Sequence, residues 1–226
     1  MRFEIGAHIR RARESAGLSL RSVAAAVGVS PSLLSQVETD KVQPSVGTLY
    51  AIVSRLGLSI DELLAGGAPA PSSETARGRS RQYSPVQRAE DAPTIVMENG
   101  VTWERLAVRG QDDPVDPLLT TYAPGGGSSL DEVYMTHNGY EYGLIISGEL
   151  TLKLEYESYT LRAGDSVCFD SRRPHLYVNH TDQETRGIWF VLGGPGSSRT
   201  PSDPHGVGTI RNAVDVINNI GREHDE

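Results

Sequence analysis

The chain has 226 residues and a formal net charge of −8, with 38% hydrophobic and 22% charged residues, which is the composition of an ordinary globular protein. No stretch approaches the roughly 18 apolar residues of a membrane helix, and the N-terminus lacks the apolar core of a secretory signal. The single cysteine, Cys168, forms no internal disulfide and is expected to be a small buried hydrophobe, so the sequence favours a reducing, cytoplasmic location.

The negative charge lies in the second half of the chain. Residues 1–66 carry seven Lys/Arg and six Asp/Glu, and residues 67–93 carry four and three. Residues 94–226 carry ten and twenty. The front of the chain is therefore close to neutral and can approach a phosphate backbone, whereas the acidic back half is poorly suited to it.

Residues 1–66 have the pattern of short helices. Apolar residues recur at helical spacing in the first segment, which Gly17 ends, and serine N-caps start the later ones. We expect Arg10, Arg11 and Arg13 to form a solvated charge run on the first helix. The predicted helices cover residues 5–16, 20–27, 31–38, 45–56 and a short fifth segment capped by Ser59.

The second and third of these helices and the turn between them resemble a helix-turn-helix. Ala24 is small where the two helices must approach, Gly28 permits the turn, and Ser30-Pro31 is a good helix start. Over about residues 5–65 the chain is similar to the five-helix domain of phage-repressor-like regulators, the xenobiotic-response-element class. The resemblance implies that the helix over 31–38 enters the major groove of double-stranded DNA.

The same resemblance implies which residues contact the operator. Ser32, Ser35 and Gln36 are expected to face base edges, and Ser30 to cap the helix and reach a phosphate. The alternative is that this surface is only a solvated helix face. Because one such head contacts few base pairs, a homodimer on symmetric half-sites is implied. The remaining expected contacts, to the DNA backbone, come from Arg21, Lys41 and Gln43.

Beyond the head, Pro, Gly and Ser dominate residues 67–93, which predicts a linker. Short apolar runs separated by turn residues then predict an antiparallel barrel or sandwich over 94–193. A tail over 194–226 contains one amphipathic segment, 210–220, that either docks as a helix or stays disordered. The predicted strands cover residues 101–108, 118–122, 142–146, 150–156, 159–161, 167–169, 176–178 and 188–192.

Two spaced motifs in this second half resemble those of the cupin superfamily. The chain departs from the family pattern at Met135, where the first motif usually has a histidine, and at Asp170 and Arg172, where the second usually has proline and glycine. The resemblance implies a cupin-type double-stranded β-barrel, and hence an α+β protein of two domains. The matching residues are His137, Glu141 and Gly148 in the first motif and Gly164, His175 and Asn179 in the second.

Three of the four usual cupin ligands are kept: His137, Glu141 and His175. Two imidazoles and a carboxylate suit Fe(II) with open positions, and Mn, Ni or Zn are further candidates. Two alternatives stay open, a metal-free pocket that hydrogen-bonds an organic effector and a purely structural polar cluster. The expected effector-binding residues are Tyr122, Met135, His137, Glu141, Arg172, His175, Tyr177 and Trp189.

Two functions compete for this architecture. The first is a transcriptional regulator whose barrel binds a small-molecule effector, with or without a metal, and changes operator binding. The second is a mononuclear non-haem iron oxygenase or epoxidase, since one such phosphonate epoxidase has the same helical head, barrel and ligand spacing. The reading surface on the third helix appears complete in the sequence, and the only cations near the motifs are Arg172 and Arg173. We therefore expect a regulator and not an enzyme.

Overall fold

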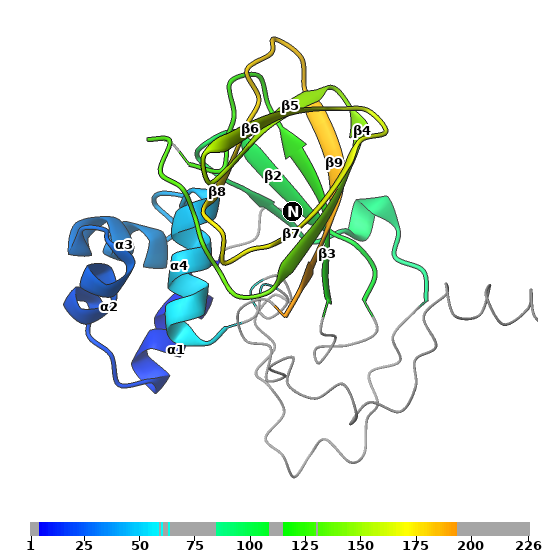
Figure 1. Cartoon of the computed structure of the whole chain (residues 1–226). Coiled ribbons are helices and arrows are strands. Elements are labelled where there is room, and N and C mark those ends of the chain that lie inside the picture. The colour runs from blue at the N-terminus through cyan, green and yellow to red at the C-terminus, as the bar shows by residue number, and fades with distance from the viewer. Residues whose placement is uncertain are drawn as a thin grey trace, which may run out of the picture.

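The computed structural model describes residues 5–58, 60, 63, 85–108, 115–129 and 131–193, and shows a helical head beside a β-domain (Figure 1). The described residues contain four α-helices rather than the expected five. Of the fifth, which Ser59 was expected to cap, only Ile60 and Leu63 are described; both are helical and buried. The helices are α1 (Gly6–Ser15), α2 (Leu20–Val27), α3 (Pro31–Glu38) and α4 (Val46–Leu56).

The helices of the head begin where the sequence places their caps. The hydroxyl oxygens of Ser19, Ser30 and Ser45 each accept a hydrogen bond from the backbone N–H three residues later, at 3.1, 3.0 and 3.2 Å. Each bond satisfies one of the donors that a helix start leaves unpaired. Gly28 ends α2 with φ of 75°, a left-handed conformation that strongly favours glycine. The predicted turn between α2 and α3 is confirmed.

A buried ion pair holds α1 to α3. The guanidinium of Arg13, a residue only 8% exposed, donates to the carboxylate of Glu38 from Nε at 2.6 Å and from Nη2 at 2.8 Å. Its third nitrogen donates to the carbonyl of Leu18 at 3.0 Å. The expectation of a solvated charge run holds for Arg10 and Arg11, which are exposed, and is wrong for Arg13. Arg13 is buried because the planar guanidinium finds acceptors for its three nitrogens in one place.

In the described residues the β-domain has nine strands in two antiparallel sheets. The larger sheet has the order β1-β2-β3-β9-β4-β7 and the smaller has the order β6-β5-β8. All eight predicted strands are present, and the ninth, β1, is three residues long and escaped prediction. The bounds are β1 (Thr94–Val96), β2 (Val101–Arg105), β3 (Val115–Tyr122), β4 (Tyr140–Ser147), β5 (Glu149–Leu154), β6 (Glu157–Arg162), β7 (Ser166–Asp170), β8 (His175–Val178) and β9 (Thr185–Leu192), with a 3-10 turn, η1 (Ala89–Asp91), before them.

The two sheets face each other and hold the core between them (Figure 1). A closed barrel was expected, but in the described residues the hydrogen-bonded ladders form two separate sheets. Outside the named strands, the chain between β3 and β4 pairs with the small sheet through two isolated bridges, Gly127 with Val178 and Met135 with His175. The segment between β3 and β4 runs beside β8 without forming a strand. The two sheets are therefore joined there by side-chain packing and isolated bridges, and not by a continuous ladder.

Strand alternation corrects the prediction for Cys168. On β7 the buried position is taken by Phe169, which is 6% exposed, so Cys168 points to the outer face and is exposed. The apolar setting Ser166-Val-Cys-Phe169 did not reveal which alternate set faces the core.

Helix α4 lies against the β-domain (Figure 1), and the backbone N–H of Gly47 donates to the carbonyl of Ser128 at 3.0 Å. None of the described helices is long and apolar enough to cross a membrane. Of the predicted linker, residues 85–93 are described, whereas residues 67–84 and the tail over 194–226, with its amphipathic segment 210–220, lie outside the described residues.

Candidate metal and effector site

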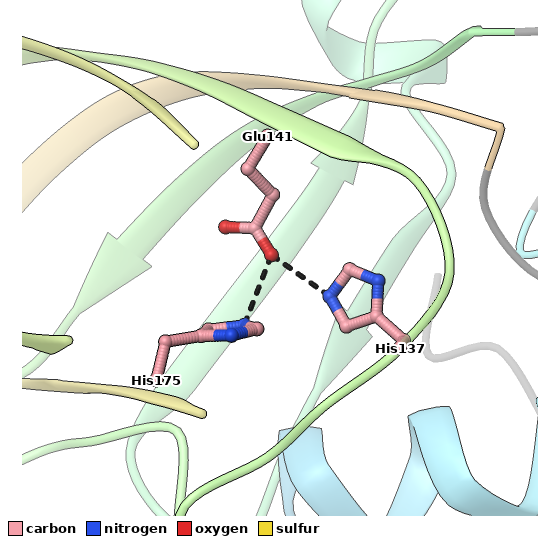
Figure 2. A group of neighbouring side chains, drawn as sticks. All are labelled: His137, Glu141 and His175. Atoms are coloured by element: carbon pink, nitrogen blue, oxygen red, sulfur yellow. Dashed lines mark hydrogen bonds and ion pairs between the residues drawn. The ribbon is translucent and has the colours of Figure 1, made fainter. Parts of the chain in front are cut away.

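Three elements bring the motif residues together between the two sheets (Figure 2). Glu141 is on β4 of the large sheet and points inward, because the exposed Tyr140 and Tyr142 occupy the alternate positions. His137 precedes β4, and His175 is the first residue of β8 in the small sheet. The three residues are 3%, 6% and 0% exposed for Glu141, His137 and His175.

One carboxylate oxygen is the centre of the cluster. Oε1 of Glu141 lies 2.8 Å from Nε2 of His137 and 3.1 Å from Nε2 of His175 (Figure 2). One ligand atom from each residue lies within 4.8 Å of the other two. This is the spacing of donors that can share one metal ion.

The other ring nitrogens assign the hydrogens. Nδ1 of His137 lies 3.1 Å from the carbonyl of Asn138, and Nδ1 of His175 lies 2.8 Å from the carbonyl of Arg173. A carbonyl oxygen only accepts, so each Nδ1 carries a hydrogen, and Nε2 is the nitrogen of each ring that is directed at Glu141, where it donates when protonated and can bind a cation when it is not. Nε2 of His175 is buried and has no hydrogen-bond partner in the described structure, despite its short distance to Glu141. Two Nε2 atoms directed at one carboxylate oxygen form an arrangement in which a metal ion can take the place of the ring protons.

A chain of donors fixes the second carboxylate oxygen. The hydroxyl of Tyr177 donates to Oε2 of Glu141 at 2.9 Å, and Nε1 of Trp189 donates to that hydroxyl at 3.2 Å. Burial and the neighbouring Glu141 raise the pKa of Tyr177 well above its usual value, so its hydroxyl stays a donor. Burial alone would raise the pKa of Glu141, but the two histidines lower it below its usual range and keep the carboxylate ionised.

Beside this cluster is a small cavity of about 20 Å³. Five of the expected effector-binding residues line it: Tyr122, Met135, Glu141, Tyr177 and Trp189. Arg172 is not brought there. Its side chain is 70% exposed and forms an ion pair with Asp170, with Nε 2.9 Å from Oδ1. The pKa of Asp170 is lowered to about 2 by hydrogen bonds from Arg172.

Sequence reasoning missed the part of the lining that comes from the head. Val46 and Tyr50 of α4 line the cavity together with Trp103 of β2. The ring of Tyr50 stacks on the imidazole of His137, with centroids 4.2 Å apart and planes at 3°. Helical periodicity shows that Tyr50 is buried, but nothing in the sequence says which surface of another domain it meets.

The predicted DNA-contact residues are all at least partly exposed in the structure. Ser32 and Gln36 on α3, with Arg21 and Lys41, are exposed, and Ser35 is partly exposed. Ser30 and the partly exposed Gln43 line a second cleft of about 590 Å³ between the head and the β-domain, which Glu98 and Asp131 also line. The structure thus leaves the outer face of α3 free among the described residues.

Comparison with known families agrees with both parts of the fold. Residues 9–63 match the helix-turn-helix family and residues 118–191 match the cupin domain family. Both matches lie inside the predicted domains 1–66 and 94–193, whose boundaries stay predictions.

Individual relatives match half of the chain or more. The HTH-type transcriptional regulator PuuR of Escherichia coli is 26% identical over 197 residues, covering 87% of this chain and 95% of PuuR. An uncharacterized HTH-type transcriptional regulator of Mycobacterium tuberculosis is 32% identical over 117 residues, covering 51% of this chain and 83% of its own length. The crystal structure of an HTH_3 family transcriptional regulator from Vibrio cholerae has the same fold, with a TM-score of 0.57 and 20% identity over 84% of this chain and 95% of that one.

Proposed function

Because this chain belongs to the helix-turn-helix transcriptional regulators and carries a cupin domain, we propose that a small-molecule effector binds beside His137, Glu141 and His175 and changes how the head binds its operator. The observation that carries the proposal is the buried Nε2 of His175, which lies 3.1 Å from the Glu141 carboxylate and has no hydrogen-bond partner in the described structure. A buried nitrogen without a partner beside a carboxylate is rare in a folded protein, and a bound ligand would satisfy it.

The three residues fit a divalent metal. Their donor set of two imidazoles and one carboxylate suits Fe, Mn, Ni or Zn, and both Nδ1 atoms are already held by backbone carbonyls, as in most protein metal sites. A bound ion would supply a positive charge to which a polar group of the effector binds. Tyr177 and Trp189 hold the carboxylate in place for either kind of ligand.

A metal titration separates the metal-bound site from the metal-free pocket. Isothermal titration with Zn²⁺, Mn²⁺ and Ni²⁺ is compared between the native chain and His175→Ala, with His180→Ala as the matched control because His180 is exposed. Tight binding of one ion that only His175→Ala abolishes supports the metal site. Equal affinities in all three proteins would exclude it and leave the hydrogen-bonding pocket.

The second part of the proposal is that residues of the head contact the operator DNA. Ser32, Ser35 and Gln36 would read base edges, and Gln36 is able to pair bidentately with adenine. We expect Gln36→Ala to weaken binding to the DNA upstream of the protein's own gene by about 1–3 kcal/mol and to relax sequence preference. The control, Arg10→Ala, changes an exposed residue on α1. Unchanged affinity and preference in Gln36→Ala would contradict this assignment.

We further infer that the regulator acts as a homodimer, because one head reads only one half-site. The outer face of the large sheet supports this inference. Four alternate residues of β4 are apolar and 43–48% exposed, and the first three of them are paired with apolar residues of β9. Exposed apolar faces of this kind mark interaction sites. The face consists of Tyr140, Tyr142, Leu144 and Ile146 on β4 and Ile188, Phe190 and Leu192 on β9.

Sedimentation of Leu144→Lys tests this face, with Tyr156→Lys as the control because Tyr156 lies in the fully exposed turn after β5. We expect Leu144→Lys to be monomeric and Tyr156→Lys to stay dimeric. Cys168, which is paired with Tyr142 in the sheet, should react with maleimide faster in the monomer. A native chain that sediments as a monomer would contradict the dimer, and a dimeric Leu144→Lys would contradict this face.

The iron enzyme is the second candidate, because the same three ligands would serve it. The named relatives are regulators, and the described lining of the small cavity contains no Lys or Arg that would hold a phosphonate. Arg172 and Arg173 are instead paired with Asp170 and Glu155 at the surface. We infer a regulator that works in the cytoplasm, with no catalytic residue. Oxygen consumption that requires Fe(II) and a phosphonate would overturn this inference.

A further inference from the structure

Helix α4 of the head covers the small cavity of the β-domain. Tyr50 is 3% exposed, with its ring parallel to the His137 imidazole at 4.2 Å and edge-on to Trp103 at 5.4 Å. Val46, one helical turn earlier on α4, lines the same small cavity. A side chain of the DNA-reading domain therefore packs directly on a residue of the candidate ligand set.

A hydrogen-bonded path continues from α4 into the site. Gly47 donates its N–H to the carbonyl of Ser128 at 3.0 Å. Ser128 is fully buried, and its hydroxyl oxygen accepts a hydrogen bond from the backbone N–H of Tyr177 at 3.1 Å. The position of α4 is thus linked to β8, the strand that carries both His175 and Tyr177.

The volume of the cavity beside Tyr50 limits the size of the ligand that can bind. A cavity of about 20 Å³ holds one water molecule or one metal ion. Pockets for small organic ligands measure roughly 300–1,000 Å³. The three candidate ligand atoms already lie within 4.8 Å of one another with the head in place, so a metal can bind there, whereas an organic effector needs Tyr50 and α4 to move away.

Resting on the proposed function, we propose that Tyr50 is a positioning residue that occupies the effector site, so that head docking and effector binding exclude each other. The effector would be a small molecule whose flat face takes the place of the phenol ring on His137, among the aromatic side chains of Trp103, Tyr122 and Trp189. Tyr50 would hold the imidazole plane in the docked state.

Displacing α4 would move the whole head. Leu49 and Ile52 of α4 are buried in the same core as Val23 and Leu34 of α2 and α3. In the docked state, the expected phosphate contacts Ser30 and Gln43 share a cleft with Glu98 and Asp131. These acidic side chains repel a DNA backbone, so the docked state is the weaker DNA binder and the effector strengthens binding.

The first test uses 4-methylphenol, the free form of the tyrosine side chain, as the probe. We expect Tyr50→Ala to bind it at least tenfold more tightly than the native chain by NMR titration. Tyr50→Phe should behave as the native chain, because the stacking uses the ring. The control Tyr156→Ala, in the exposed turn after β5, should also behave as the native chain. Equal affinity in Tyr50→Ala and the native chain would overturn the proposal.

The second test locks the head with a reversible cross-link. A Cβ atom on Gly47 would lie 3.7 Å from Cβ of Met135, which suits a disulfide. Gly47→Cys and Met135→Cys are combined with Cys168→Ser, which removes the native thiol. We expect the oxidised protein to bind upstream DNA at least tenfold more weakly than the same protein after reduction. Equal DNA affinity in both forms, with the cross-link verified, would contradict the exclusion.

The two proposals can fail separately. If the reduced protein binds no specific DNA, the regulator function is wrong whatever the probe does. Specific DNA binding could persist while Tyr50→Ala leaves the affinity for 4-methylphenol unchanged and the cross-link leaves the affinity for DNA unchanged. In that case the role of Tyr50 is wrong and the regulator function stands.

Discussion

Each domain buries one carboxylate among basic side chains, and the two carboxylates are satisfied in different ways. Glu38 in the head is 6% exposed and receives two hydrogen bonds from the guanidinium of Arg13. Glu141 in the β-domain is 3% exposed and faces two imidazoles, one of which leaves Nε2 unsatisfied. The head cluster is complete without a ligand, whereas the β-domain cluster is not. This difference separates a structural ion pair from a candidate binding site.

The largest expected effect is on the complete cluster. Arg13→Ala leaves Glu38 buried without its partner, which typically costs about 3–5 kcal/mol of folding free energy. Urea unfolding of the head should show this loss, while Zn²⁺ affinity stays the same. Arg10→Ala is the matched control, because Arg10 forms an exposed pair with Glu14 that is worth at most about 1 kcal/mol. Equal destabilisation by both variants would remove the contrast with the β-domain.

At the Glu141 cluster we expect a change to reduce metal affinity more than stability. Glu141→Gln removes the charged ligand, and we expect Zn²⁺ affinity to fall by about 100-fold or more, since even the partners of ligands are worth about 10–100-fold. The apo protein should lose much less stability than Arg13→Ala does, because the amide oxygen of the glutamine can still accept the hydrogen bond from Tyr177. Strong destabilisation with unchanged Zn²⁺ affinity would show that this cluster is structural, like the one in the head.

Tyr177→Phe tests the hydrogen bond that Tyr177 donates to Glu141. It removes the hydroxyl that donates to Oε2 of Glu141 at 2.9 Å and keeps the ring. We expect Zn²⁺ affinity to fall by about 10-fold. Tyr159→Phe serves as the control, since the Tyr159 hydroxyl bonds Glu157 on the exposed surface. A loss of the same size in Tyr159→Phe would show that the effect does not come from the site.

The sequence predicted these two clusters unequally. Motif spacing was enough to select His137, Glu141 and His175, and caps and turn residues were enough to place the four described helices. The prediction that Arg13 is solvated was wrong, because a run of charges on a helix does not show that one of them points inward toward another helix. Tyr50 was missed for the same reason: periodicity identifies a buried face and leaves its partner open. Strand β1 and the single bridges that close the sheets are too short to carry a pattern.

The smallest expected effect is at Arg172, which the sequence placed among the effector-binding residues and the structure places at the surface beside Asp170. Because hydrogen bonds from Arg172 lower the pKa of Asp170 to about 2, the pair stabilises the folded chain above about pH 4 and loses this contribution as the pH falls toward 2. The contribution is small, since Arg172 is exposed and Asp170 is only partly buried. In Arg172→Ala an NMR titration should find the pKa of Asp170 back near its usual range, with Zn²⁺ affinity within about twofold of native. A loss of Zn²⁺ affinity comparable to that of Tyr177→Phe would return Arg172 to the site, because its charge would then act on the Glu141 cluster across the surface.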